Sequence, residues 1–388
     1  MTDLPRVVVV GGGVAGLSAA LELGKRGCET TLIERDLLIG KSSSLSTGVF
    51  TRMYSDPLDI EMRAVSYRRM EELERQGRVT FRRIGYMRLG RDQGSVDRFV
   101  DGLPLLRELG VEDSLVLSPG EISEVVPSLS TDGLCGALYS PTDGYLDGHL
   151  LCQTYAEEAT ELGVRINQRS GLRAVEGGGE EPYRLQTEAE TFEADLVVNA
   201  AGAWATEVGE LLGAAVPCLP IREQVCLGKF PEPLGHPMPF VMDYVPGDPK
   251  PGLWLRDEGH DQFLAGLHSN EPLEPPVDDP DGYVKTVDDE FIEDVAVRLM
   301  ERLASIPELG LKAGWTGLYP TSPDGQAMVG PHPEAERVIV AAGLGGVGIM
   351  LSPVLGSLVA EFAVDGDATA VSDVARLSPG RFTAERRR

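Results

Sequence analysis

The order of apolar and polar residues predicts a βαβ unit at the start of the chain. Residues Val7 to Val10 form a continuous apolar run typical of a strand, and Val14 to Arg26 has apolar residues at helical spacing before Gly27. A second strand is predicted from Thr30 to Ile33, and Glu34 follows it directly. This opening predicts an α/β fold.

The rest of the chain also mixes helices and strands, and we find no internal repeat. The segment from Arg78 to Leu138 reads as short strands and helices. The clearest further predictions are a helix from Asp56 to about Gln76, a helix over Gly148 to Leu162 that leads into a strand over Val164 to Asn167, a hairpin around the loop Gly177 to Glu181, a strand over Leu196 to Ala200, mostly strands from Pro217 to about Gly266, an acidic loop over Pro272 to Gly282, and an amphipathic helix over Asp288 to Ile306.

One uncharged segment, Val338 to Ala360, is apolar enough to suggest a membrane span. Its glycines and the pair Ser352 and Pro353 argue against a helix exposed to lipid. A strand, a glycine loop and a buried helix explain the segment better, so no integral membrane segment is expected.

The glycines between the first strand and the first helix predict a dinucleotide site. Gly11, Gly13 and Gly16 form a GxGxxG pattern, in which the glycines allow a tight turn, approach of the backbone to a pyrophosphate and close packing of helix on strand. The helix N-terminus favours the phosphates, and Glu34 stands where an acceptor for ribose hydroxyls is expected. The motif does not distinguish NAD from FAD.

Composition narrows the possible partners and the compartment. The 388 residues carry a formal charge of -26, which repels nucleic acid and anionic membranes. Only six residues are lysine, a composition that resembles a cytosolic protein of a salt-loving organism. The five cysteines are scattered without metal-ligand spacing and are expected to be reduced. The N-terminus lacks a signal-peptide pattern, so we expect a cytoplasmic protein without a metal site.

Four distant segments carry a family resemblance: IGKSSSLSTGVFTRMYSDP, YSPTDGYLDGHLL, ADLVVNAAGAW and the stretch from Gly314 to Gly356. With the GxGxxG motif they resemble the D-amino-acid-oxidase-like family of FAD enzymes, which includes glycine oxidase, monomeric sarcosine oxidase and dimethylglycine dehydrogenase. The resemblance implies a Rossmann-type FAD-binding domain over residues 1-85, 144-215 and 325-388, interleaved with a mixed-sheet, α+β substrate domain over residues 86-143 and 216-324.

The resemblance, together with suitable donor groups, indicates which residues hold FAD. Short hydroxyl side chains in the serine-rich loop suit phosphate and flavin oxygens, and backbone N–H groups of the last glycine loop suit negative charge on a reduced flavin, although a surface loop and simple helix packing are the alternatives. The predicted cofactor residues are Gly11, Gly13, Val14, Ala15, Gly16, Glu34, Arg35, Ser42, Ser43, Ser44, Thr47, Gly48, Val49, Leu172, Ala201, Gly202, Trp204, Gly345, Gly346, Val347, Gly348, Ile349 and Met350.

The resemblance to sarcosine oxidase also suggests substrate residues. Arg52 falls where that branch has an arginine for the substrate carboxylate, and His268 falls on an active-site histidine; an ion pair and a structural histidine are the alternatives. Arg256 is a possible second cation, with an exposed hairpin arginine as the alternative. Hydride would pass from the carbon beside a neutral amine to flavin N5, and water would hydrolyse the resulting imine.

This chain departs from the family pattern at several reactive positions. Met350 replaces a carboxylate-binding lysine, and Tyr319 replaces an arginine that clamps the carboxylate in glycine oxidase. Gly317 replaces the cysteine that attaches flavin, and no histidine occupies the loop from Ser42 to Thr47, so FAD is expected to be noncovalent. An apolar residue, Leu264, occupies the position of the oxygen-activating lysine.

The missing lysine favours a dehydrogenase for a small amino acid or N-alkyl amino acid that resembles sarcosine, dimethylglycine or proline, with a quinone or carrier protein as electron acceptor. The alternatives are an oxidase for amines or hydroxy acids, a flavin-binding assembly or scaffold protein, and an NAD-dependent dehydrogenase.

Overall fold

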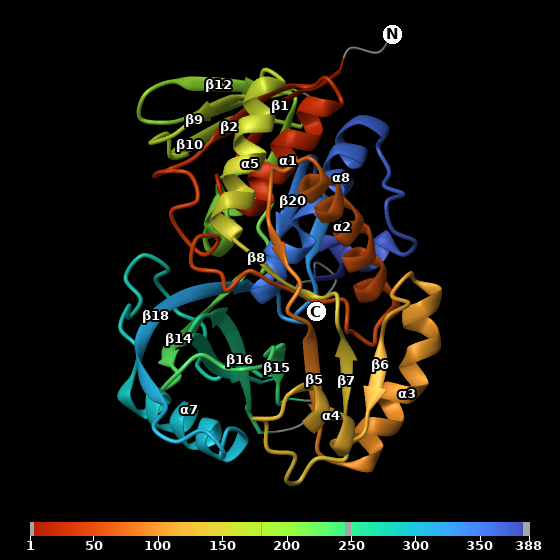
Figure 1. Cartoon of the computed structure of the whole chain (residues 1–388). Helices are drawn as coiled ribbons and strands as arrows, with labels where there is room; N and C mark the ends of the chain where they lie inside the picture. The colour runs from red at the N-terminus through yellow and green to blue at the C-terminus, as the bar shows by residue number, and fades with distance from the viewer. Residues whose placement is uncertain (1–3, 180, 245–249, 270, 383–388) are drawn as a thin grey trace.

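Two large β-sheets lie one above the other and share the chain between them (Figure 1). The computed structural model describes residues 4–179, 181–244, 250–269 and 271–382. Both the red N-terminal segment and the blue C-terminal helix α8 belong to the upper part of the molecule in this view. The chain therefore crosses between the two sheets more than once.

The upper sheet has six strands in the order β19-β20-β13-β1-β2-β9, and all neighbours are parallel except β19 and β20. Val7 and Val9 pack with the helices on one face, whereas Val8 and Val10 belong to the cluster on the other face. Burial on both faces explains the continuous apolar run of the first strand. The strands are β1 (Arg6–Val10), β2 (Glu29–Ile33), β9 (Arg165–Asn167), β13 (Leu196–Asn199), β19 (Met328–His332) and β20 (Ala335–Ala342).

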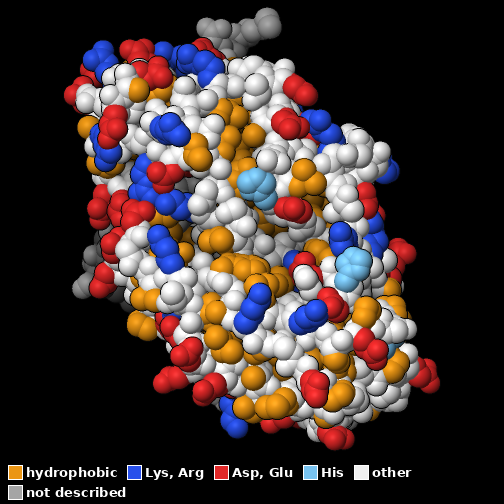
Figure 2. Space-filling view, turned by 60° about the vertical axis from the view of Figure 1, so that its left-hand side comes forward, with side chains coloured by type: hydrophobic (Ala, Val, Ile, Leu, Met, Phe, Trp, Pro, Cys, Tyr) orange, Lys and Arg blue, Asp and Glu red, His pale blue; other side chains and the backbone are white. Residues whose placement is uncertain are grey.

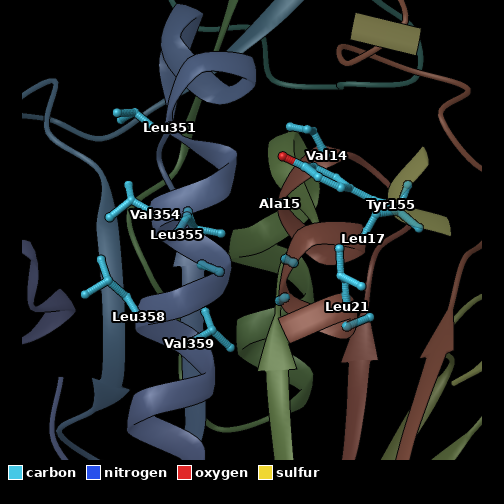
Figure 3. Packing of buried hydrophobic residues seen from close by; sticks show 14 of the residues in the cluster. Val14, Ala15, Leu17, Leu21, Tyr155, Leu351, Val354, Leu355, Leu358 and Val359 are labelled. Atoms are coloured by element: carbon cyan, nitrogen blue, oxygen red, sulfur yellow. The ribbon is translucent and has the colours of Figure 1, made fainter. Parts of the chain in front are cut away.

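Helices α1 (Val14–Lys25), α2 (Pro57–Arg75), α5 (Gly148–Glu161) and α8 (Gly348–Asp365) form the helical layer of this part. Figure 3 shows α1 and α8 side by side, with Leu17 and Leu21 of α1 and Leu355 and Val359 of α8 in one buried cluster. The Ser18 hydroxyl of α1 donates a hydrogen bond to the carbonyl of Ser352 at 2.6 Å. Helices α1 and α8 are therefore held in close contact.

The opposite face of the six-stranded sheet is covered by a small antiparallel sheet. Its strands are β10 (Ala174–Gly178), β11 (Glu181–Gln186) and β12 (Thr191–Ala194). Tyr183, Leu185 and Phe192 pack there with Val8 and Val10. The hairpin predicted around Gly177 is confirmed, with a change of register between Glu176 and Gly178.

The lower sheet has eight strands in the order β18-β14-β17-β16-β15-β5-β7-β6, with β15 and β5 parallel and the other neighbours antiparallel. Leu253, Leu255 and Leu267 pack on one face with Val295 and Leu299 of helix α7, while the other face turns toward the upper part. The strands are β5 (Tyr86–Gly90), β6 (Leu115–Leu117), β7 (Gly136–Ser140), β14 (Leu219–Lys229), β15 (Phe240–Met242), β16 (Gly252–Gly259), β17 (Gln262–His268) and β18 (Gly310–Thr321).

Short elements connect and cover the two large sheets. A third small sheet pairs β8 with both β3 and β4. These elements are β3 (Val49–Phe50), β4 (Phe81–Arg82), β8 (Gly144–Leu146), α3 (Gln93–Glu108), α4 (Pro119–Val125), α6 (Ala205–Leu211), α7 (Asp289–Arg302) and the 3-10 helices η1 (Gly202–Trp204), η2 (Gly345–Val347), η3 (Val374–Leu377) and η4 (Pro379–Phe382).

The predicted α/β fold with a mixed second sheet is confirmed. All strands of the eight-stranded sheet come from residues 86–140 and 219–321, whereas the other described strands come from the remaining segments. We propose that residues 1-85, 144-215 and 325-388 form one domain and that residues 86-143 and 216-324 form the other.

The uncharged segment near the C-terminus forms strand β20, helix η2 and helix α8, as predicted. The stretch Gly345–Asp365 is long and apolar enough to cross a membrane by length and composition. Its residues Leu351, Val354, Leu355 and Leu358 are instead buried in the core (Figure 3). Packing inside the protein accounts for this apolar character.

A glycine at the contact between α1 and α8 provides a test of this packing. A Cβ on Gly356 would lie 2.7 Å from the backbone oxygen of Ser18, whereas a Cβ on Gly102 in α3 would have nothing within 4 Å. We expect Gly356→Ala to destabilise the protein by about 2 kcal/mol through overpacking. Gly102→Ala should be neutral or stabilising because alanine favours helix. Thermal unfolding of both variants measures this, and equal effects would contradict the packing argument.

Candidate active site

A cavity of about 950 Å³ lies between the two sheets. It extends from the glycine-rich turn after β1 to residues on the inner face of the eight-stranded sheet. In the space-filling view, hydrophobic side chains show through across the middle of the visible face, with acidic and basic side chains over the rest (Figure 2). The cavity is large enough for a sizeable cofactor together with a small substrate.

The turn between β1 and α1 brings backbone close to backbone. Gly11 has φ +116°, and a Cβ there would lie 2.4 Å from the carbonyl oxygen of Ala200. A Cβ on Gly16 would lie 1.9 Å from the carbonyl oxygen of Gly11, so helix and turn touch directly. Gly13 lies at the N-terminus of α1 and lines the cavity. The turn leaves room for a pyrophosphate beside the helix N-terminus.

Glu34 lies at the end of β2 and binds this turn. Its carboxylate accepts hydrogen bonds from the backbone N–H of Gly12 at 2.7 Å and of Asp36 at 2.8 Å. Glu34 also lines the cavity, and a carboxylate has lone pairs left to accept hydrogen bonds from ribose hydroxyls. This geometry fits the nucleotide end of a dinucleotide.

The same end of the cavity is closed by a contact between distant segments. The Arg35 guanidinium lies 4.5 Å from the ring centre of Trp204, and it donates hydrogen bonds to the Asp281 carboxylate at 2.8 and 3.0 Å. Trp204 Nε1 donates to the same carboxylate at 3.2 Å. Asp281 thereby joins the loop after β17 to the nucleotide-binding segments.

The second predicted glycine loop, Gly345 to Gly348, lines the same cavity as the turn between β1 and α1. Helix η2 and the N-terminus of α8 line the cavity with residues Gly345 to Met350. The Tyr319 ring lies against the backbone of Gly346, where an added Cβ would be 2.5 Å from the ring. Two helix N-termini, those of α1 and α8, therefore border one cavity, and both favour negative charge.

Most of the predicted cofactor residues line this cavity. Three do not. Ser44 turns its hydroxyl to the carbonyl of Lys41, and Gly16 and Gly48 pack directly against backbone oxygens. The predicted residues found in the lining are Gly11, Gly13, Val14, Ala15, Glu34, Arg35, Ser42, Ser43, Thr47, Val49, Leu172, Ala201, Gly202, Trp204, Gly345, Gly346, Val347, Gly348, Ile349 and Met350, together with His268 and Tyr319.

The prediction that Arg52 binds the substrate carboxylate is wrong, because Arg52 does not line the cavity. Its Nε donates to the Asp143 carboxylate at 2.8 Å, and its Nη2 donates to the Thr142 hydroxyl at 2.6 Å. Its guanidinium also lies 4.0 Å from the ring centre of Tyr67. Asp143 is fully buried, so this ion pair needs both partners. The alternative role for Arg52, a structural ion pair, is the one that the structure shows.

Arg256 is also not an exposed hairpin arginine. It is buried, stacks on Tyr145 at 4.1 Å and pairs with Glu258. Burial lowers the pKa of Arg256 to about 10. It does not line the cavity, so it contributes no cation to a substrate site.

Two other arginines reach the cavity from the substrate side. Arg88 on β5 is 8% exposed and donates to the Tyr244 carbonyl and the Tyr86 hydroxyl, both at 3.0 Å. Arg63 on α2 is fully buried, pairs with Asp59 at 2.8 Å and stacks on Tyr54. Among the described residues, no carboxylate forms an ion pair with Arg88. A buried guanidinium without an anionic partner is costly, so an anion is expected beside Arg88.

His268 lies at the end of β17 near the same group. Its ring meets Tyr244 edge to face, with ring centres 5.0 Å apart. The His268 side chain is exposed to the cavity, and desolvation by the surrounding protein, then the charge of Arg88, lowers its pKa to about 4. The imidazole is therefore neutral at pH 7 and can both donate and accept a hydrogen bond.

A row of aromatic rings forms the wall beside Arg88. Tyr86 stacks on Phe240 with ring centres 5.1 Å apart, and Phe240 stacks on Trp254 at 5.9 Å. Gly266 lets the indole lie flat, because a Cβ there would be 2.6 Å from Trp254. These rings provide an apolar surface for the carbon skeleton of a small substrate.

Sequence reasoning missed Arg63, Arg88, Glu223 and the aromatic row. Arg88 in YMRLG and Glu223 in PIREQV are charged residues inside runs with strand character, which is a usable signal. The pattern shows that such residues lie on one face of a strand, but it does not show that this face borders a cavity.

Comparisons with known proteins agree with this geometry. The family described as "DAO: FAD dependent oxidoreductase" matches residues 6–362. Glycine oxidase of Geobacillus kaustophilus is 27% identical over 93% of both chains, and its crystal structure superposes with a TM-score of 0.79 over 96% of this chain and 98% of that one. Mitochondrial dimethylglycine dehydrogenase of Rattus norvegicus is 27% identical over 98% of this chain, which spans 45% of that enzyme.

The crystal structure of L-proline dehydrogenase from P. horikoshii has the same fold, with a TM-score of 0.87, 24% identity and 99% of both chains covered. The residues of the cavity fit FAD: a phosphate turn at one helix N-terminus, a ribose acceptor, and a second helix N-terminus at the other side. Because the family match spans nearly the whole chain, the protein belongs to the DAO family of FAD-dependent oxidoreductases, with FAD as its cofactor.

Proposed function

We propose that this protein is a dehydrogenase that oxidises the C–N bond of a small amino acid or N-alkyl amino acid resembling sarcosine, dimethylglycine or proline. The main support is Arg88, a buried cation in the cavity without a carboxylate partner among the described residues. A substrate carboxylate would complete this site, because a guanidinium binds a carboxylate through two parallel hydrogen bonds. The relatives named for glycine, dimethylglycine and proline act on molecules of this class.

The residues around Arg88 would orient such a substrate. The neutral His268 would hydrogen-bond the carboxylate or the amine, and the aromatic row would contact the carbon skeleton and exclude water. FAD, when bound, accepts a hydride from the carbon beside the nitrogen. The protein's part is to hold that carbon in a reactive orientation, which lowers the activation free energy of hydride transfer.

The proposal of a dehydrogenase rests on the charges of the cavity. Among the described residues that line the cavity, Lys41 is the one lysine. It lies at the nucleotide end, beside Trp204. Leu264, at the position of the oxygen-activating lysine, is buried outside the lining. Negative charge that develops on dioxygen would therefore lack a lysine to stabilise it. A quinone or a carrier protein would accept the electrons instead.

An anaerobic screen of amino acids that follows the flavin spectrum tests the proposed function. N-methyl amino acids or proline should bleach the bound flavin of protein purified in high salt. If no amine or hydroxy acid reduces the flavin, the scaffold alternative gains support. Reduction by hydroxy acids alone would favour the other oxidoreductase alternative.

Substitution of Arg88 tests the carboxylate site. We expect Arg88→Met to weaken binding of the amino-acid substrate by about 100-fold, because a charge-assisted pair is lost. Binding of an amine that lacks the carboxylate should change little. Arg52→Met is the matched control: it should lower the melting temperature and leave the dissociation constant of the folded protein unchanged. A substrate titration of the flavin spectrum measures both, and a larger effect at Arg52 would restore the original assignment.

The electron acceptor can be tested directly. We expect the substrate-reduced protein to be reoxidised at least about tenfold faster by an artificial quinone acceptor than by air, since no lysine stabilises superoxide-like charge. Stopped-flow recovery of the oxidised flavin spectrum gives both rates. Equal rates, with stoichiometric hydrogen peroxide in air, would show an oxidase.

Attachment of the cofactor gives a further prediction. The cysteines of the chain do not line the cavity, and His268 is the histidine in the described lining, on the substrate side. Gly317 and the loop from Ser42 to Thr47 contain neither the cysteine nor the histidine through which the resemblance would attach flavin. Acid precipitation should therefore release all the flavin into the supernatant. Yellow colour that stays with the precipitated protein would contradict noncovalent binding.

A further inference from the structure

Glu223 is a carboxylate in the cavity to which no function has been given above. It lies on β14 opposite Gly317 of β18, and glycine has no side chain to cover it. The residue is half-buried and lines the cavity. Among the described residues, no group donates a hydrogen bond or forms an ion pair to its carboxylate. The cavity therefore holds an uncompensated acidic group as well as the uncompensated cation of Arg88.

The strand register places Glu223 at the substrate end of the cavity. Strands β14 and β17 are antiparallel, and Cys226 pairs with Ala265 at the end of their ladder. Glu223 lies three residues before Cys226, and His268 lies three residues after Ala265, so both leave the ladder at the same end. On the other side, Ile221 pairs with Tyr319, which makes Tyr319 a diagonal neighbour of Glu223.

The charged and titratable groups that line the cavity together with Glu223 come from five other segments. Its neighbours Arg222 and Gln224 donate hydrogen bonds to the carboxylates of Glu274 and Asp288. Tyr319 approaches from β18 and His268 from β17, while Glu271 of the following loop lines the cavity. Arg63 and Arg88 line the cavity as well, without an ion pair to Glu223.

These surroundings decide which group can exchange a proton near neutral pH. Burial, and then the charge of Glu274, raises the pKa of Glu223 to about 8. The pKa of His268 is about 4, which makes the imidazole a poor base. Burial raises the pKa of Tyr86 to about 12, and desolvation by the cavity walls, then the charge of Glu223, raises the pKa of Tyr319 above its usual range. A general base is most effective when its pKa lies near the working pH.

We propose that Glu223 binds the ammonium group of the substrate and takes its proton. This rests on the proposed function, since an amino acid carries one charge for Arg88 and the opposite charge for Glu223. Amines are protonated at neutral pH, and an ammonium has no lone pair with which to form a C=N bond. Glu223 first releases its own proton to water; one N–H bond of the ammonium then breaks, its electron pair stays on nitrogen, and an O–H bond forms on the Glu223 carboxylate. With FAD bound as the hydride acceptor, the carbon would then give up its hydrogen with the bonding pair, and the nitrogen lone pair would form the C=N bond.

The rate of flavin reduction by an amino acid at subsaturating concentration, followed anaerobically from pH 6 to 10, tests the catalytic step. Glu223→Gln should slow reduction by about 100-fold at pH 7, the usual contribution of a general base, and should approach the wild-type rate at pH 10, where the free amine is abundant. Glu271→Gln removes another carboxylate of the lining and should follow the wild type. An unchanged pH profile in Glu223→Gln would overturn the proposal while leaving the proposed function intact.

Calorimetry tests the site without turnover. The probe is 2-aminoisobutyrate, an amino acid without a hydrogen on the carbon beside its nitrogen, titrated into the FAD-loaded protein at pH 7 in two buffers of different ionisation enthalpy. The wild type should release about one proton per ligand, because Glu223 is protonated in the free protein below its pKa of about 8 and either Glu223 or the ammonium gives up a proton on binding.

Glu223→Gln should release none, Glu271→Gln should behave as the wild type, and Glu223→Asp, which keeps the carboxylate, should restore part of the release. Equal proton release in the wild type and in Glu223→Gln would overturn the assignment. If no amino acid reduces the flavin of the wild type at any pH, the proposed function fails; loss of proton release in Glu223→Gln would then still support Glu223 as an ammonium site.

Discussion

The contact between α1 and its neighbours is the constraint on which the cavity depends. At Gly11 and Gly16 the turn touches other backbone atoms without intervening side chains, and at Gly356 helix α8 touches Ser18 in the same way. These contacts bring the N-termini of α1 and α8 to one cavity, although the two helices lie more than 300 residues apart in the chain. Two regions of positive potential then face one space, which suits the pyrophosphate of FAD and a reduced flavin.

The substrate side follows from a different physical rule. Side chains alternate across a strand, so one face of the eight-stranded sheet packs on α7 and the other borders the cavity. Charged residues such as Arg88 and Glu223 can lie on the second face because that face borders the cavity. Among the described residues, Arg88 has no carboxylate partner and the carboxyl group of Glu223 has no hydrogen-bond donor or ion-pair partner, and this arrangement matches the carboxylate and the amine of an amino acid. The surrounding aromatic rings keep the local dielectric constant low, which strengthens both interactions.

Several features were predictable because they depend on local pattern. The βαβ opening, the phosphate turn, Glu34 and the buried C-terminal helix are encoded by short-range spacing and by glycine at positions that only glycine tolerates. The family resemblance extended this to FAD and to the mixed second sheet. Arg52 could not be assigned from local pattern: its residue type and position match the family, but its guanidinium is held by Asp143, 91 residues away in the chain.

The sequence by itself determined the nucleotide end of the site, because a turn and a helix N-terminus bind phosphate through backbone groups whose placement depends on neighbouring residues. Only the tertiary structure decided the substrate end. Arg63, Arg88 and Glu223 come from α2, β5 and β14, and their proposed roles depend on which of them have a partner once the sheets are assembled. The sequence shows which side chains can carry a charge, but whether a partner neutralises that charge depends on contacts between distant segments.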